Sequence, residues 1–229
     1  MSTKDAIALL DQELKDDFNR SGSSLMYVSE TNELIALTLD SSSFVAGHFY
    51  IVLYWMPLYA PTNHLVFNFG TRLRHSNNSE LWSLEDVQND DSRLSLIQAA
   101  KKWKQSISKR RVRCAYLRAE HRKGFPYAGR ALFYDFAMHH QFQKATRVLR
   151  TMSARTIRKD WHKALIEEMS TCVTFFADPQ QLDKHLTSTV QQNRSTLSIP
   201  IPLARLLIRV LNRPPRFAYR GENQPHPIE

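Results

Sequence analysis

The sequence predicts an α+β protein: an N-terminal helix and a sheet of about four antiparallel strands, followed by a mainly α-helical C-terminal portion. Three observations predict this class. Apolar residues stand close to helical spacing at the start, strand-forming residues then alternate with turn-forming ones, and from Leu96 apolar residues recur every three or four positions. The 229 residues are 42% hydrophobic and 23% charged, which is typical of a globular protein with a core.

The sheet portion is predicted from one helix and four strand-like runs. Ile7, Leu10 and Leu14 lie near helical spacing within a helix expected from Lys4 to Arg20. The strands are expected at Leu25–Val28, at Leu34–Leu39, within Phe49–Tyr59 and at Val66–Leu73, where β-branched and aromatic residues are bounded by turn residues.

The helical portion is predicted from a change of period. Leu96, Ala100, Trp103, Ile107, Cys114 and Leu117 share one stripe, which predicts a single long helix ended by Gly124 and Pro126. Further helices are expected at Ala131–Thr151, at Arg158–Thr171, from an Asp178 cap with Pro179 in its first turn, and at Leu203–Leu211. The predicted organisation is a sheet portion at 1–92, a helical portion at 93–212 packed on it as one compact unit, and a flexible tail at 213–229.

Composition favours a reducing compartment and no membrane segment. No apolar run approaches the roughly 18 residues of a membrane span, and the start of the chain lacks the pattern of a secretion signal. Cys114 and Cys172 are too few for a disulfide framework and lack the CxxC spacing of a metal or redox site. A cytoplasmic protein is therefore expected.

The charge is divided unevenly along the chain. Residues 1–100 hold 6 Lys/Arg and 13 Asp/Glu, whereas residues 101–229 hold 25 and 9. Ten cations and one acidic residue fall within 101–123, so the net charge of +9 equals the excess of this segment. The candidate polyanion-binding residues are Lys101, Lys102, Lys104, Lys109, Arg110, Arg111, Arg113, Arg118, Arg122 and Lys123.

Two interpretations of the basic segment stand side by side. It is either a surface for phosphates or the solvated flank of a helix that also meets the acidic N-terminal half. Helical projection spreads the charge around the helix instead of along one stripe. Nucleic-acid surfaces also tend to interleave aromatic residues, and Trp103 and Tyr116 are expected in the core.

Local catalytic motifs are missing from the sequence. HExxH, CxxC, GxSxG and glycine-rich phosphate loops do not occur. His139 and His140 are adjacent, so a helix would point them about 100° apart, which does not suit one metal ion. No catalytic residue, metal site or cofactor is predicted, and an enzyme ranks third among the functions considered.

Two runs of the chain carry a resemblance to a family. FNRSGSSLMYVSETNELIALTLDSSSF and GHFYIVLYWMPLY, together about residues 15–60, resemble bacterial uncharacterised domains, and IEEMSTCVTFFADPQQLDKHL (166–186) is more loosely similar to a later part of them. Some relatives look like immunity proteins encoded beside polymorphic toxins. The resemblance implies binding of a partner without catalysis, and its motifs mark turns and core, so no functional residue is carried over. The long basic helix departs from the family pattern.

The favoured function is a non-catalytic bacterial cytosolic protein of the immunity or accessory type, which sequesters or scaffolds a protein partner. Its contacts are expected from exposed aromatic residues and from the acidic connector with Glu85, Asp86, Asp90 and Asp91. The alternative is a nucleic-acid-binding accessory, for example of a defence system, that uses 101–123 with help from Arg205, Arg209, Arg213, Arg216 and Arg220. Salt separates the two, because phosphate docking weakens steeply with added salt.

Overall fold

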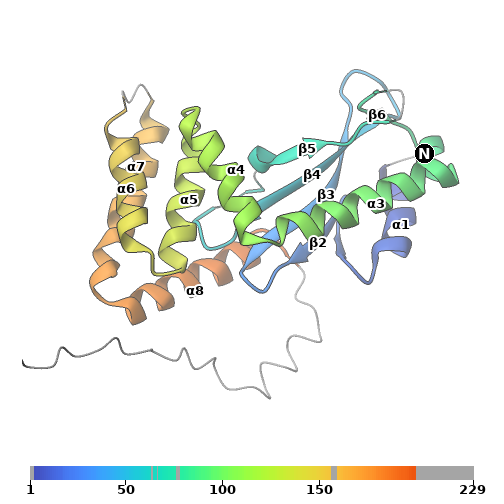
Figure 1. Cartoon of the computed structure of the whole chain (residues 1–229). Coiled ribbons are helices and arrows are strands. Elements are labelled where there is room, and N and C mark those ends of the chain that lie inside the picture. The colour runs from blue at the N-terminus through green and yellow to red at the C-terminus, as the bar shows by residue number, and fades with distance from the viewer. Residues whose placement is uncertain (1–2, 63, 66, 76–77, 156–158, 200–229) are drawn as a thin grey trace, which may run out of the picture.

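The computed structural model describes residues 3–62, 64–65, 67–75, 78–155 and 159–199. It confirms the α+β class: α1 (Thr3–Leu14) and an antiparallel sheet precede a series of helices (Figure 1). The predicted helix Leu203–Leu211, the tail at 213–229 and the arginines between 205 and 220 lie outside the described residues. Within the described ranges, no helix has the length and apolar character needed to cross a bilayer.

The sheet contains six strands among the described residues, two more than the four main runs predicted. Its strands are β1 (Asn19–Ser21), β2 (Ser24–Val28), β3 (Glu33–Ser41), β4 (Phe49–Pro57), β5 (Gly70–Arg72) and β6 (Leu81–Trp82). They follow the order β1-β2-β3-β4-β5, with β6 also paired to β4. The added strands are very short. The predicted extension of the first helix to Arg20 is wrong, because the N–H groups of Asp17 and Phe18 both bond to the carbonyl of Leu14 and end α1 there.

The last main strand is shorter than predicted. Instead of a strand from Val66 to Leu73, a 3₁₀ turn, η1 (Phe67–Phe69), precedes β5. The turn directs Phe69 inward, where its ring stacks on Trp55 at a centroid distance of 5.1 Å. Gly70 then lies against β4 so closely that a Cβ atom there would stand 2.6 Å from the carbonyl oxygen of Leu53. Close packing on β4 therefore fixes where the strand begins.

The predicted long basic helix is two helices. α2 (Leu84–Gln88) leads into α3 (Asp90–Ile107), and α4 (Arg110–Arg122) follows after Ser108 and Lys109. The apolar stripe continues across the break, since Ile107, Cys114 and Leu117 are all buried, so periodicity does not reveal it. Gly124, at φ 95°, follows the end of α4 as predicted.

The predicted helix Ala131–Thr151 is also two helices. α5 (Pro126–Met138) begins with Pro126 in its first turn, and α6 (Phe142–Ser153) follows a short turn. His140 adopts φ 53° in that turn, a left-handed conformation that non-glycine residues adopt infrequently, and the N–H of Gln141 bonds to the carbonyl of Phe136. The turn contains neither Gly nor Pro, so the sequence has no strong signal for it.

The last helices agree more closely with expectation. α7 (Asp160–Val173) is shifted by two residues from the predicted range, and a 3₁₀ turn, η2 (Thr174–Ala177), follows it. α8 (Pro179–Thr196) begins as predicted, because the Asp178 side chain accepts hydrogen bonds from the N–H groups of Gln180 and Gln181.

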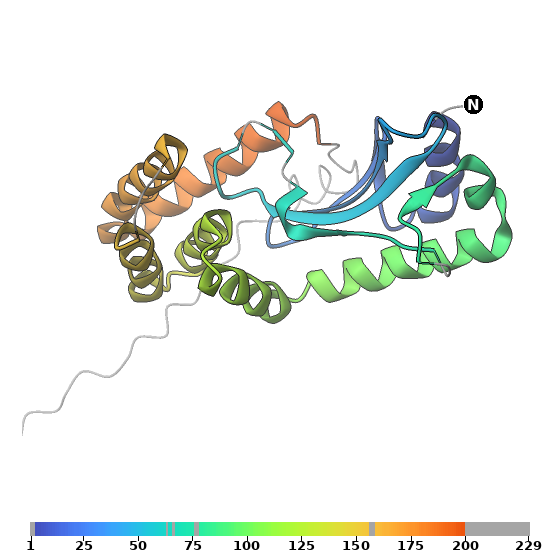
Figure 2. The ribbon, with the colours of Figure 1, turned by 90° about the horizontal axis from the view of Figure 1, so that it is seen from above.

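The core has two parts that meet in the sheet. One joins α1, α2 and the first half of α3 to the strand ends that carry Leu37, Leu39 and Ile51. The other joins α4 to α8 to the opposite strand ends, which carry Leu34, Tyr54 and further apolar residues. Trp103 packs against both parts, and α3 runs along the sheet from one part to the other (Figures 1 and 2). The predicted boundary at 92/93 falls within the first turn of α3.

Candidate polyanion-binding surface

Helix α4 exposes three arginines along one side. Arg111, Arg118 and Arg122 are seven and four residues apart, so a helix brings them within about 40° of one another around its axis. All three side chains are exposed. The buried side of the same helix carries Arg113, Cys114, Leu117 and His121. These three arginines therefore form a stripe, whereas Arg110 and Arg113 of the same helix pair with acidic residues.

Two lysines of α3 contact the acidic N-terminal half. Lys101 and Lys104 lie 3.5 and 2.8 Å from the carboxylate of Asp17, and the ammonium of Lys104 also stands 4.2 Å from the ring centroid of Tyr27. The hydrogen bond from Lys104 lowers the pKa of Asp17, although partial burial acts in the opposite direction. These lysines attach α3 to the segment after α1. This agrees with the interpretation of the basic segment as a helix flank that meets the acidic N-terminal half.

Arg113 lies in the interior and pairs with the strand residue Glu33. Its side chain is 1% exposed, and Nη2 donates to Glu33 Oε1 at 2.6 Å. The hydroxyls of Ser29 and Thr31 donate to the other oxygen of Glu33. Burial raises the pKa of Glu33, against the opposing effect of the Arg113 charge. Arg113 therefore joins α4 to β3 and does not reach the surface.

Arg110 also has a protein partner. Its guanidinium donates through Nε and Nη2 to the buried carboxylate of Asp135 on α5, with Nη2 at 2.7 Å from Oδ2. The Cys114 thiol lies 3.2 Å from the same oxygen. Burial, followed by the charge of Asp135, raises the pKa of Cys114 to about 11, so this thiol is protonated near neutral pH and is a poor nucleophile.

The remaining candidates lie on the surface. Lys123 is 70% exposed and pairs with Glu120 one turn earlier at 2.6 Å. No ion-pair partner is found within the described part of the chain for Lys102, Lys109, Arg111, Arg118 or Arg122. Lys102 is on α3 and Lys109 in the break, whereas the three arginines share the exposed side of α4.

Helix α6 adds cations that sequence analysis missed. Lys144, Arg147 and Arg150 are spaced by three and are exposed, whereas Ala145, Val148 and Met152 are buried. Arg147 and Arg150 line an open hollow of about 380 Å³ together with Phe142, Gln143 and Thr146. The sequence carries the signal, since the cations recur with the period of a helix. It was hidden because the positive and negative charges outside 101–123 are equal in number.

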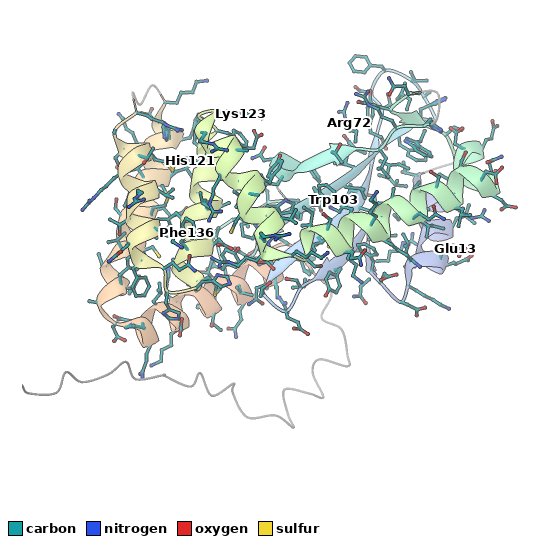
Figure 3. All side chains as sticks on the ribbon, in the orientation of Figure 1. Glu13, Arg72, Trp103, His121, Lys123 and Phe136 are labelled. Atoms are coloured by element: carbon teal, nitrogen blue, oxygen red, sulfur yellow. The ribbon has the colours of Figure 1, made fainter. Side chains whose placement is uncertain are left out.

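Phe136 on α5 connects the two sets of cations. The guanidinium of Arg118 on α4 and the ammonium of Lys144 on α6 stand 5.7 and 5.8 Å from the centroid of this ring. In Figure 2, α5 lies between α4 and α6, and Figure 3 labels Phe136 in this region. We define the basic surface as Arg111, Arg118, Arg122, Lys144, Arg147 and Arg150.

The described ranges show no candidate metal site. They contain no group of three or more His, Cys, Asp or Glu side chains that could hold a metal ion. Tyr116, expected in the core, is 37% exposed, while Trp103 is partly buried between the two core parts as expected. Tyr116 is therefore a surface residue, near Lys123 and on the other side of α4 from Arg111, Arg118 and Arg122.

Comparison of the chain with protein-family models, with curated proteins and with solved structures finds no match. The resemblance of about residues 15–60 and 160–186 to bacterial domains with immunity-protein-like relatives therefore stays a prediction.

Proposed function

We propose that this protein binds nucleic acid through the basic surface and that its role is binding, not catalysis. The observation that carries the proposal is the alignment of six exposed cations on α4 and α6, for which no acidic partner is found among the described residues. Uncompensated charges of one sign on neighbouring helices repel one another. A polyanion that accepts them all removes this repulsion and releases its own counterions.

Arginine chemistry further supports phosphate as the recognised group. Five of the six cations are arginines, whose planar guanidinium groups bind phosphate oxygens in a bidentate manner and remain charged at any physiological pH. Phosphate contacts fix position without reading sequence. The proposal therefore predicts affinity that depends little on base sequence and strongly on salt.

The test is a titration of labelled DNA and RNA at about 50 and 200 mM salt with the native protein and with the triple variant Arg111→Ser, Arg118→Ser, Arg122→Ser. Each lost phosphate contact lowers the slope of log K against log salt by about 0.7 to 0.9. The triple variant is thus expected to reduce the slope by about two to three and to weaken binding strongly at the lower salt.

The matched control is a triple variant with Lys4, Lys15 and Arg20 changed to Ser. These cations are also exposed but lie in the N-terminal half, so the change in net charge is identical while the basic surface stays intact. Equal weakening by both variants would mean that net charge alone matters. Absence of binding at the lower salt would contradict the proposal outright.

A second candidate function, sequestration of a protein partner, is favoured by the tip of the β3–β4 hairpin. Phe44 is 89% exposed there and Val45 is 37% exposed. The backbone N–H groups of both residues bond to the Ser42 hydroxyl, so the turn holds the aromatic ring outward. An exposed aromatic residue on a fixed turn is typical of an anchor for a protein pocket.

The second candidate would make the chain an immunity-type or accessory protein of the cytoplasm. Its test is affinity purification from the source cells with the native protein and with Phe44→Ser. A partner that survives added salt and is lost with the variant supports the candidate, because an apolar interface depends little on salt. A partner retained equally by both proteins contradicts a role for the hairpin tip.

A further inference from the structure

A continuous series of contacting aromatic rings runs from the middle of α4 through η1 and the start of α5 to the start of α7. Phe69 stands edge-on to Tyr116 and to Phe125, each at 6.3 Å between centroids. Phe125 contacts Tyr127 at 5.9 Å, and Tyr127 stacks on Trp161 at 5.4 Å. We call these five residues the aromatic series. Its two ends are its most exposed members, since Tyr116 is 37% and Trp161 is 42% exposed.

Trp161 is held in a defined orientation. Its indole lies only 4° from parallel to the ring of Tyr127, and the ring of His162 stands 5.8 Å away at 30°, while 42% of the residue stays exposed. Tryptophan is usually well buried on average, and an exposed, rigidly supported indole offers a flat apolar surface for another ring. The fixed orientation lowers the entropy cost of stacking a ligand there.

Exposed lysines lie near both ends of the aromatic series. Lys159 and Lys163 flank Trp161 in the chain and are exposed, and Lys123 stands just before Phe125 at 70% exposure. Lys163 pairs with Asp160 at 3.6 Å, as Lys123 does with Glu120, and exposed pairs of this kind cost little to exchange for another anion. Arg122 and Lys123 are consecutive, so the helix points them about 100° apart: Lys123 lies on the side of Tyr116, and Arg122 lies with Arg111 and Arg118 on the other side of α4.

We propose that the ligand is single-stranded nucleic acid, with bases stacked on Trp161 and Tyr116, their own phosphates held by Lys123, Lys159 and Lys163, and more distant phosphates of the strand held by the basic surface. This inference rests on the function proposed above and names the strand class. A duplex keeps its base faces covered by neighbouring bases, so exposed rings gain nothing from it except at its ends. A single strand presents a π-face on every base together with its phosphates, which matches aromatic and cationic groups placed side by side.

The test combines affinity with the intrinsic fluorescence of the folded full-length chain. Trp55 and Trp82 are 1% and 3% exposed, and Trp103 is partly buried, so Trp161 is the indole most accessible to a stacking base. The protein is titrated with a thymidine oligonucleotide and with a duplex of the same length, both at about 50 mM salt. We expect the single strand to quench the fluorescence and to bind more tightly than the duplex.

Variants at Trp161 separate stacking from general apolar contact. Trp161→Leu keeps an apolar side chain but removes the ring, and we expect single-strand affinity to fall about 5- to 100-fold, the loss of one stacked base, with quenching abolished. Trp161→Tyr retains a ring and is expected to keep most of the affinity. Phe44→Ala removes an exposed ring from the remote hairpin tip and is expected to change neither quantity.

The outcomes distinguish the two proposals. Binding of single strand and duplex with equal affinity, unchanged by Trp161→Leu and sensitive to the arginine triple variant, overturns the single-strand inference and leaves nucleic-acid binding intact. No binding of either overturns both. Circular dichroism and a melting curve of Trp161→Leu establish that the variant is folded, so a loss of affinity is assigned to the missing ring.

Discussion

Asn193 fastens the last described helix to the end of the central strand. Its side chain is 2% exposed, and Nδ2 donates to the carbonyl oxygens of Leu58 and Ala60 at 2.7 and 2.8 Å. Its Oδ1 accepts from the N–H of Thr62 at 3.1 Å. One amide therefore satisfies three backbone groups of the irregular segment after β4 and attaches α8 to that segment.

Replacement of Asn193 by Leu is expected to destabilise the fold by about 2 to 4 kcal/mol, because the change leaves buried backbone groups without partners at nearly constant volume. Equilibrium unfolding in denaturant measures the loss. The control is Gln192→Leu, which makes a comparable change at an exposed position of the same helix. A difference of less than about 0.5 kcal/mol between the variants would contradict the role given to Asn193.

The two thiols are expected to be unreactive in the folded protein. Burial raises the pKa of Cys114 to about 11 and that of Cys172 to about 12, so little thiolate exists at about pH 8. Mass spectrometry after brief alkylation should show both cysteines unmodified in native buffer and both modified in denaturant. Fast modification of the native protein at Cys114 would mean that the Asp135 carboxylate does not lie against a protonated thiol.

His121 is expected to make stability depend on pH. Burial, and then the positive charge of Arg155, lower the pKa of this histidine below its usual 6.5. The unfolded chain therefore binds a proton that the folded chain resists, so stability falls as pH falls below about 6.5. Unfolding at several pH values should show a shallower fall for His121→Gln. His48→Gln, on the β3–β4 loop, controls for loss of a histidine, and an unchanged slope in His121→Gln would contradict the assignment.

Helix α4 has two sides with different roles. The buried side pairs Arg113 with Glu33, and the exposed side carries the three arginines of the basic surface. The guanidinium of Arg113 also donates to the carbonyls of Ile107 and Ser108 at 2.7 and 3.0 Å, which satisfies backbone groups freed by the break before α4. This residue therefore stabilises both the helix break and its attachment to β3.

Removal of one member of the buried Arg113–Glu33 pair should lower the free energy of unfolding substantially. Arg113→Met leaves Glu33 buried without its cation and is expected to destabilise the fold by about 3 to 5 kcal/mol. Adding Glu33→Gln to this variant should restore part of the lost stability. A double-mutant cycle in denaturant measures the coupling between the two residues. Arg111→Met on the exposed side is the matched control and should change stability by at most about 0.5 kcal/mol. Additive effects of the two buried changes would contradict the pairing.

The types of the helices and strands were predictable from the sequence, but several of their boundaries were not. Burial periodicity located the apolar stripe from Leu96 to Leu117, whereas the break at Ser108 and Lys109 depends on Arg113 reaching back to the carbonyls before it. Lys109 forms no side-chain cap, and His140 ends α5 in a left-handed conformation without Gly. Such boundaries are set by tertiary contacts, and no local residue pattern indicates them.

The candidate surface was predictable only in outline. The concentration of cations at 101–123 identified the region, and the structure then divides them into four that bind Asp17, Glu33 or Asp135 and others that are exposed. These acidic partners are 80 or more residues away for Lys104 and Arg113, so pairing was not readable from sequence. The contribution of α6 required the proximity of Arg118 and Lys144 at Phe136.

For the whole molecule, the two parts of the core are expected to unfold together. Trp103 and Tyr27 pack against both parts, and β3 and β4 run through both. Loss of either part therefore exposes apolar surface of the other. Denaturation followed by far-ultraviolet circular dichroism and by tryptophan fluorescence should give coincident transitions. Two separated midpoints would instead indicate two units that fold independently, one on each side of α3.

The Glu33–Arg113 pair also has a consequence for synthesis of the chain. Glu33 is made 80 residues before its partner, which at roughly 5 to 20 residues per second is a wait of about 4 to 16 s on the ribosome. Until α4 emerges, closing the sheet would bury an unpaired carboxylate. We therefore expect the β3–β4 core to be less stable until α4 emerges, so that a nascent chain halted before Arg113 exposes more apolar sheet to chaperones and proteases than the finished chain does.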